Sequence, residues 1–235
     1  MKVVVLNASS RRDGNSATLS QEAARGAKDA GHDVETLFLA DYVAGLLGDC
    51  KTCRDANGQC TIGDNYGELL VNHVVPADAL ILATPLHYYG MAGRMKAFID
   101  RLFCYTSNSA PDGERIMASL PGKRVGVVIS CEETYQGATL GLIAQFQELT
   151  RYNRQELVGV VVGVANTRGE VRRDPSNPLQ RAYDLGRRLF EAHVTDYRLD
   201  TPRSNHVWLD DGTPANKSVS GDDALTSTPP AGSAD

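Results

Sequence analysis

Four short, almost uninterrupted runs of aliphatic residues recur at wide intervals and constrain the fold of this chain more than any other feature. They are Val3–Leu6, Ala79–Ala83, Val125–Ile129 and Val158–Val164, and a weaker fifth run covers Asp33–Leu39. Strands with one face in water alternate apolar and polar residues, whereas continuous apolar runs are typical of strands buried on both faces. The runs therefore predict a parallel sheet with helices on both faces.

Segments with helical patterns lie between these runs. The clearest places Met95, Phe98, Ile99 and Leu102 at the spacing of one helix face. The predicted helices are Ser16–Ala30, Ala92–Phe103, Thr139–Leu149 and Leu179–His193. Strands that alternate with helices in this way predict a single open, doubly wound α/β sheet, and short right-handed crossovers leave only a few strand orders.

Length and composition bound the classes of protein that this chain can belong to. The 235 residues suffice for one α/β domain, which we place at 1–200. The net charge of −5, without a long basic run, argues against nucleic acid or an anionic membrane as a partner. Val3–Leu6 is too short for a signal-peptide core, and five cysteines are an odd number, so we expect a cytoplasmic protein with reduced thiols.

Three segments fall outside the strand and helix pattern. A glycine- and cysteine-containing insertion occupies 41–67, between the second and third predicted strands. The segment 201–211 contains the only tryptophan, Trp208, and we expect it to dock on the domain or on a second subunit. The segment 212–235 is rich in Ser, Thr, Pro, Gly and Asp and has few large apolar residues, so it is predicted to be disordered.

The loop after the first strand has the chemistry of a phosphate site. Small polar residues and Arg11 precede a helix, whose first N–H groups and dipole favour an anion. Ser9, Asn15 and Ser16 offer neutral donors, and Arg11 offers a planar cation. Ordinary helix capping and a solvated arginine are the competing interpretation. Neither a GxGxxG nor a GxxxxGK[ST] sequence is present.

This loop, NASSRRDGNSATL, resembles the phosphate loop G-S-x-R-x-x-G-N-[ST] of the NADPH-dependent FMN reductase family, within the flavodoxin-like superfamily. The residues that match are Ser9, Arg11, Gly14, Asn15 and Ser16. The chain departs from the pattern at Ala8 and Ser10, which are both small. The resemblance covers about residues 1–195 and implies bound FMN and a five-stranded flavodoxin-like sheet in the order 2-1-3-4-5.

A second loop carries a longer resemblance to the same family. TPLHYYGMAGRMKAFIDR, beginning at Thr84, is similar to the family segment that cradles the flavin ring. The implied cofactor contacts are Pro85, Leu86, His87, Tyr88, Tyr89 and Gly90. Pro85 would fix the backbone as the chain leaves the strand, and the tyrosines offer flat surface for the ring. His87 stands where the family has Tyr, and a loop histidine bonded to its own backbone is the alternative interpretation.

A third loop follows the fourth strand and closes on the flavin in the family that the chain resembles. Cys131, Glu132 and Thr134 are the implied ring contacts there. Cys131 at a strand end fits a small buried apolar residue equally well. In the segment of the second loop that begins at Thr84, Lys96 and Asp100 are spaced for a surface ion pair on their helix. The surrounding K-x-F-x-D-R is interpreted as packing and subunit contact.

The cysteines of the insertion raise the question of a metal cluster. Cys50, Cys53 and Cys60 resemble part of the four-cysteine set of iron–sulfur flavoproteins, but Leu47 stands where a further cysteine would be expected. Cys104 or Cys131 would have to complete the set. Cluster-free oxidoreductases of the family keep a similar stretch, so we expect no metal and hold these cysteines as the alternative ligands.

The resemblance implies an FMN-dependent NAD(P)H oxidoreductase. A reduced nicotinamide nucleotide would donate electrons, and a quinone, flavin, azo or nitro compound would accept them in a ping-pong sequence. The cofactor would carry the chemistry, which agrees with the absence of a recognisable catalytic acid–base set in the sequence. The alternatives are an iron–sulfur flavoprotein and a flavodoxin-like electron carrier without hydride transfer. The resemblance also implies a homodimer.

Overall fold

The computed structural model of the chain describes residues 1–48, 53–107 and 110–192. Cys50 and the segments 201–211 and 212–235 lie outside the described residues, so the predictions made for them stay predictions. The described residues belong to a single compact unit.

Five parallel strands form the sheet, in the order β2-β1-β3-β5-β6. They are β1 (Lys2–Asn7), β2 (Asp33–Phe38), β3 (Ala79–His87), β5 (Arg124–Cys131) and β6 (Glu156–Val164). A short strand, β4 (Gly90–Met91), pairs antiparallel with the end of β3. The predicted α/β class, the five parallel strands and the order 2-1-3-4-5 are confirmed.

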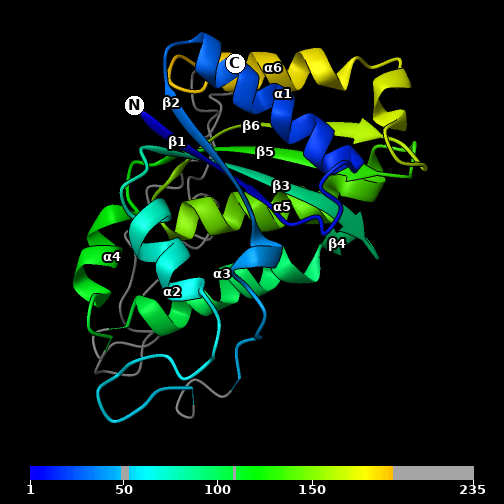
Figure 1. Ribbon diagram of the computed structural model, residues 1–235. Coiled ribbons are helices and arrows are strands. Elements are labelled where there is room, and N and C mark those ends of the chain that lie inside the picture. Colours follow the sequence, from blue (N-terminus) through cyan, green and yellow to red (C-terminus); the bar gives the residue numbers. More distant parts are fainter. Residues whose placement is uncertain (49–52, 108–109, 193–235) are drawn as a thin grey trace, which may run out of the picture. The chain divides into compact units, whose positions relative to one another are not determined.

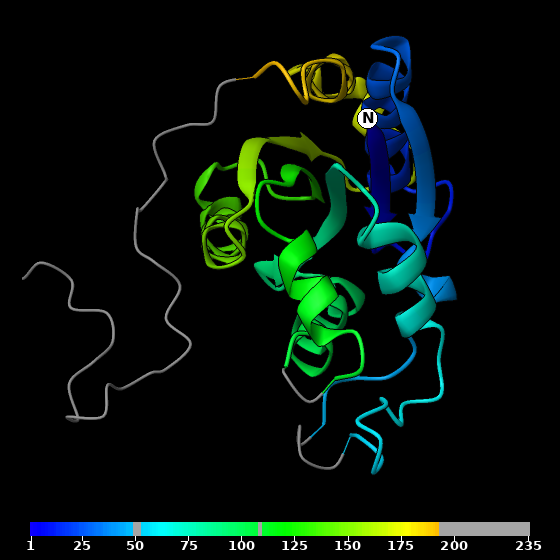
Figure 2. The same cartoon turned by 90° about the vertical axis from the view of Figure 1, so that its left-hand side faces the viewer.

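Helices cover both faces of the sheet (Figures 1 and 2). One face carries α1 (Asn15–Asp29) and α6 (Pro178–Arg187), and the other carries α3 (Gly93–Tyr105) and α5 (Gly137–Tyr152). The two faces of β1 explain why its four residues Val3–Leu6 are all apolar. Val3 and Val5 pack on the α1 side, whereas Val4 and Leu6 pack on the α3 side.

Two glycines allow α1 and α6 to pack backbone against backbone. A Cβ atom at Gly26 would lie 2.0 Å from the Tyr183 carbonyl oxygen, and one at Gly186 would lie 1.9 Å from the Ala23 carbonyl oxygen. Any larger residue would push the helices apart, so these positions require glycine.

The structure corrects several predicted boundaries. β3 does not end at Ala83 but continues to His87, because it pairs with β5 as far as Pro85 and then with β4. Pro85 therefore lies within a strand and not at its exit. The insertion 41–67 overlaps a helix, since α2 (Tyr66–Glu68) begins inside it and continues as a π-helical turn over Leu69–Val74.

The shorter elements were not predicted, because each is too brief to show a period. They are the 3₁₀ turns η1 (Leu39–Asp41) and η3 (Glu170–Arg173) and the helix α4 (Gly113–Ser119). α6 ends at Arg187, before the predicted end at His193. None of the helices in the described ranges is both long and apolar enough to span a bilayer.

Candidate functional site

The loops that follow β1, β3 and β5 meet at the carboxyl edge of the sheet, where open α/β sheets bind ligands. They enclose a mainly polar cavity of about 670 Å³, which lies in the size range of cofactor pockets. The predicted residues that line it are Ser9, Arg11, Gly14, Asn15, Ser16, Pro85, Leu86, His87, Cys131 and Glu132. Three separate sequence motifs thus converge on one cavity.

The N-terminus of α1 opens into this cavity without a side-chain cap. Its N-cap residue is Gly14, which makes no side-chain hydrogen bond, and the first turn contains no acidic residue. Gly14 also lies close to the loop, because a Cβ there would be 3.1 Å from the Arg11 Cβ. The backbone donors and positive dipole end of the helix are therefore available to an anion.

The preceding loop is held in place by its own short hydrogen bonds. The Ser9 amide donates to Asn7 Oδ1 over 2.8 Å, and the Arg11 amide donates to Ser9 Oγ over 3.1 Å. The Arg11 side chain forms no ion pair with any of the described residues, and it lies exposed at the cavity. Arg12 beside it contacts Asp41 and the Phe38 ring instead. Only the first of the two arginines lines the cavity.

Asn15 and Ser16 were predicted as neutral hydrogen-bond donors to a ligand, but both side chains connect the start of α1 to other parts of the chain. Asn15 Nδ2 donates to the Thr167 carbonyl over 2.9 Å, and Asn15 Oδ1 accepts from the Val171 amide. Ser16 Oγ lies 2.6 Å from Ser130 Oγ in a buried contact. Both residues therefore offer the cavity mainly their backbone N–H groups.

Tyr88 and Tyr89 form the two-residue turn of the β3–β4 hairpin, since His87 pairs with Gly90. Their φ angles are +46° and +62°, in the left-handed region that bulky residues avoid. Tyr88 is fully exposed at 102%, and Tyr89 is 54% exposed. Neither tyrosine nor Gly90 lines the cavity itself; the hairpin lies beyond the lining residues Pro85, Leu86 and His87. Backbone strain of this kind clusters at functional sites.

The third loop separates the cavity from a neighbouring groove. This groove has a volume of about 850 Å³ and lies between α5 and β6, and Cys131 and Glu132 line both spaces. Thr134 lines only the groove. Cys131 is buried and donates to the Glu133 carbonyl over 3.4 Å, and burial raises the pKa of its thiol. The negative charge of the nearby Glu133 raises the pKa of Tyr89.

Two further arginines belong to the cavity, and sequence analysis did not select them. Arg94 donates to Ser10 Oγ over 2.7 Å, and Arg168 pairs with Asp13 over 3.0 Å. Arg94 lies inside the second motif, so the sequence could have indicated it as a cavity residue. Arg168 follows β6 without any local pattern, and only folding brings it to the first loop. With Arg11, these guanidinium groups make the cavity suited to a negatively charged ligand.

Comparison with protein families agrees with this geometry. The model of the NADPH-dependent FMN reductase family matches residues 1–166, which include all three loops. The chain belongs to this family. Its members form a family of flavin-dependent NAD(P)H oxidoreductases that bind FMN. The residues of this family member fit that cofactor, because an uncapped helix start and Arg11 suit a phosphate, and Pro85–His87 line the same cavity.

Individual relatives of this FMN reductase family member cover most of its length. It is 30% identical over 207 residues to an iron–sulfur flavoprotein of Archaeoglobus fulgidus, covering 85% of this chain and 84% of the relative. The structure of an NAD(P)H:quinone oxidoreductase from Methanothermobacter marburgensis aligns with a TM-score of 0.61 at 19% identity, over 82% of this chain and 98% of that one. The Trp repressor binding protein of Bacillus subtilis aligns with a TM-score of 0.59 at 23% identity, over 80% and 97%.

Because one relative is an iron–sulfur flavoprotein, the cysteines need a separate test. Cys53 Sγ lies 3.0 Å from Cys104 Sγ at the end of α3, and both residues are buried. Burial, followed by the contact with Cys53, raises the pKa of Cys104 to about 12. Cys60 lies 3.8 Å from the Arg101 guanidinium. Within 1–48, 53–107 and 110–192, no three His, Cys, Asp or Glu side chains converge as metal ligands.

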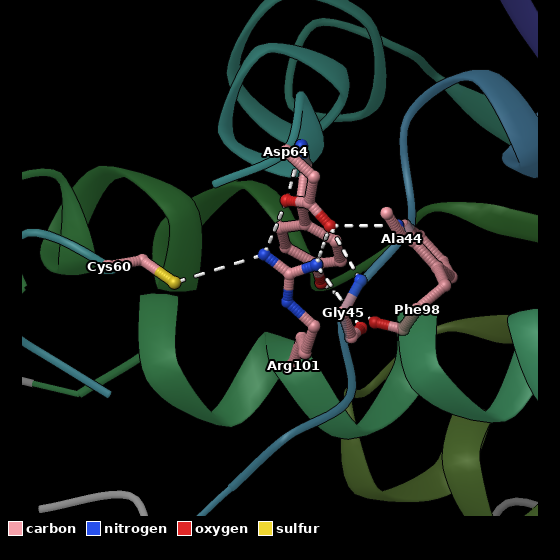
Figure 3. Close-up of polar contacts among 7 residues, drawn as sticks. Ala44, Gly45, Cys60, Asp64, Phe98 and Arg101 are labelled. Carbon is pink, nitrogen blue, oxygen red and sulfur yellow. Dashed lines mark hydrogen bonds and ion pairs between the residues drawn. The ribbon is translucent and has the colours of Figure 1, made fainter. Parts of the chain in front are cut away.

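A buried ion pair fixes the same segment to α3 (Figure 3). Arg101 donates to both carboxylate oxygens of Asp64, and the side chains are 0% and 5% exposed. The Ala44 and Gly45 amides donate to Asp64 as well, and the Arg101 guanidinium lies 4.3 Å from the Tyr66 ring centroid. The structural role expected for the K-x-F-x-D-R motif thus has a defined contact within one chain.

Proposed function

We propose that this chain is an FMN-dependent NAD(P)H oxidoreductase with a small-molecule electron acceptor. The observation that carries the proposal is the uncapped N-terminus of α1, which opens beside Arg11 into the polar cavity at the carboxyl edge of the sheet. That arrangement suits the phosphate of FMN. The family membership and the second motif support the same cofactor.

The binding roles follow from where the residues lie. The Ser9–Ser16 loop would hold the phosphate through backbone N–H groups and the Arg11 guanidinium. The backbone of Pro85–His87, with the hairpin of Tyr88, Tyr89 and Gly90, would border the ring on one side. Cys131 and Glu132 would border it on another, and Thr134 would face the adjoining groove. Bound FMN would supply hydride and electron transfer chemistry.

The donor and acceptor would then use one open site in turn, which is the ping-pong sequence expected from the resemblance. The groove between α5 and β6 adjoins the cavity, and its lining combines apolar residues such as Ile143 with charged residues of both signs, among them Arg173 and Glu133. This combination suits a flat, partly charged substrate. We also propose that the active form is a homodimer, which sedimentation velocity of the purified protein would test.

Anaerobic titration of the purified yellow protein with NADH and then NADPH tests the proposed activity. We expect the flavin absorbance near its long-wavelength maximum to bleach with at least one nucleotide and to return when a quinone is added. If the absorbance is retained with both nucleotides, the chain is a flavodoxin-like electron carrier and not a reductase. Protein that stays colourless after mixing with excess FMN would refute the assignment of the cavity.

A further inference from the structure

Two buried cysteines from distant parts of the sequence meet outside the proposed cofactor site. Cys53 precedes α2, Cys104 lies in the last turn of α3, and their sulfur atoms are 3.0 Å apart across 51 positions of the sequence. We propose that Cys53 and Cys104 are a redox modification site, which hydrogen peroxide or another small hydroperoxide converts reversibly into a disulfide.

The carbonyl group of Cys53 and the residue that follows it, Arg54, are held in place. The Arg54 guanidinium donates to the carbonyl oxygens of Phe103 and Cys104, which lie at the negative end of the α3 dipole. On the same segment, the Thr61 amide donates to the Cys53 carbonyl over 2.9 Å. Cys53 is therefore set opposite Cys104 by bonds that do not involve either sulfur atom.

A short turn makes this segment a compact unit. Asp55 Oδ1 accepts from the amides of Asn57 and Gln59, and Gly58 has a φ of +77°, which favours glycine. Arg54 and Cys60 face one another in a β-bridge across the turn. Since the turn and the Asp64–Arg101 pair both restrain the segment, forming the disulfide requires little loss of backbone freedom.

A cavity gives a small oxidant access to Cys104. It has a volume of about 210 Å³, and Cys60, Cys104 and Tyr105 are among the residues that line it. Its size admits hydrogen peroxide but excludes a protein partner. FMN in the proposed cavity would lie too far away to act as the oxidant, because Arg94 lines that cavity and Cys104 follows it on α3 by ten residues, or about 15 Å along the helix.

The reaction balances with one peroxide. The Cys104 sulfur attacks a peroxide oxygen, the O–O bond breaks, and the leaving hydroxide takes the thiol proton to become water. The Cys53 sulfur then attacks the resulting sulfenic acid, an S–S bond forms, the S–O bond breaks, and a second water leaves. Two thiols are oxidised and one hydroperoxide is reduced. Because burial raises the pKa of Cys104, the reaction should be slow at neutral pH.

The contact fits a thiol pair better than two ligands of one metal. Two sulfur ligands at ~2.3 Å from a tetrahedral zinc lie ~3.8 Å apart. The distance between Cys53 and Cys104 is shorter, at 3.0 Å. Among the described residues, no third His, Cys, Asp or Glu side chain converges with the pair as a metal ligand.

Peptide mapping of the full-length protein tests the proposal without any measurement of activity. Protein is reduced with dithiothreitol, desalted, treated with hydrogen peroxide, alkylated and digested with trypsin. Lys51, Arg54 and Arg101 place each relevant cysteine in a separate peptide. We expect Thr52–Arg54 joined to Leu102–Arg115, with the loss of two hydrogen atoms, and release of both peptides by dithiothreitol.

Serine variants and iron analysis complete the test. Cys104→Ser and Cys53→Ser should each abolish the linked peptide, whereas Cys60→Ser, beside the same cavity, should retain it. Oxidation should raise the Tm of the wild type by about 5–10 °C and should leave the Tm of Cys104→Ser unchanged. A peptide that joins Cys53 to Cys50 or Cys60, no disulfide at all, or stoichiometric iron and sulfide in anaerobically purified protein would overturn the proposal.

Discussion

Arg101 donates to both carboxylate oxygens of Asp64, and neither side chain of the pair reaches solvent appreciably. Asp64 belongs to the cysteine-containing segment and Arg101 to α3, so the pair connects the insertion to the helix that begins at the candidate site. Removing one partner leaves a buried charge without its counterion, which costs more than the pair itself contributes. The two residues therefore act as one unit in folding.

Substitution of one partner should destabilise the protein strongly. We expect Arg101→Met to lower the free energy of unfolding by about 3–5 kcal/mol, because the Asp64 carboxylate stays buried without its guanidinium. The double variant Asp64→Leu/Arg101→Met should lose less than the sum of the single variants. Urea denaturation of all four proteins measures this coupling. Additive losses, or a loss below 1 kcal/mol in the single variant, would contradict it.

The same pair should make stability depend on pH in the acid range. Burial alone would raise the pKa of Asp64, but the hydrogen bonds from Arg101 and the Gly45 and Ala44 amides outweigh it and lower the pKa from 3.8 to about 2. This contribution is therefore complete above about pH 5 and is lost as the pH falls through about 2, with a size of about 2 kcal/mol. Unfolding measured at pH 5 and at pH 2.5 should show a smaller acid loss in Asp64→Asn than in the wild type.

Neighbouring arginines in the first loop should differ in their effect on FMN binding. Arg11 lines the cavity, whereas Arg12 is engaged by Asp41. We expect Arg11→Ala to raise the Kd for FMN roughly tenfold, through loss of a charge-assisted hydrogen bond, and Arg12→Ala to change it by less than about twofold. Titration of FMN fluorescence with each apoprotein measures the constants. Equal effects of the two variants would place the phosphate elsewhere.

Substitutions that relieve the strain of the β3–β4 hairpin should stabilise the protein and weaken FMN binding. Replacing Tyr88 by Asn and Tyr89 by Gly suits their positive φ angles and should raise the free energy of unfolding by about 0.5–1 kcal/mol for each residue. Loss of the aromatic surface should at the same time weaken FMN binding.

Arg154→Gly is the matched control for the hairpin variants. Arg154 has a φ of +56° and does not line the cavity. It should gain similar stability and leave the Kd for FMN unchanged. If the hairpin variants bind FMN as tightly as the wild type, the tyrosines are not ring contacts.

The sequence alone determined the sheet and the meeting of the three loops. Continuous apolar runs such as Val3–Leu6 require burial on both faces, and strands that alternate with helices place every strand-to-helix loop at one edge. The first two motifs therefore predicted a common site before any contact was known. Local patterns predict strands and helices because the burial of a strand and the period of a helix are both recorded in residues that are neighbours in the sequence.

Only the tertiary structure decided which side chains face the cavity and which hold it together. Asn15 and Ser16 look like ligands in sequence, but they bond to Thr167 and Ser130. Arg168 reaches the first loop from beyond β6, and Cys53 meets Cys104 across 51 residues. No periodic pattern records such contacts, because they depend on how complete elements pack and not on the residues beside them in the chain.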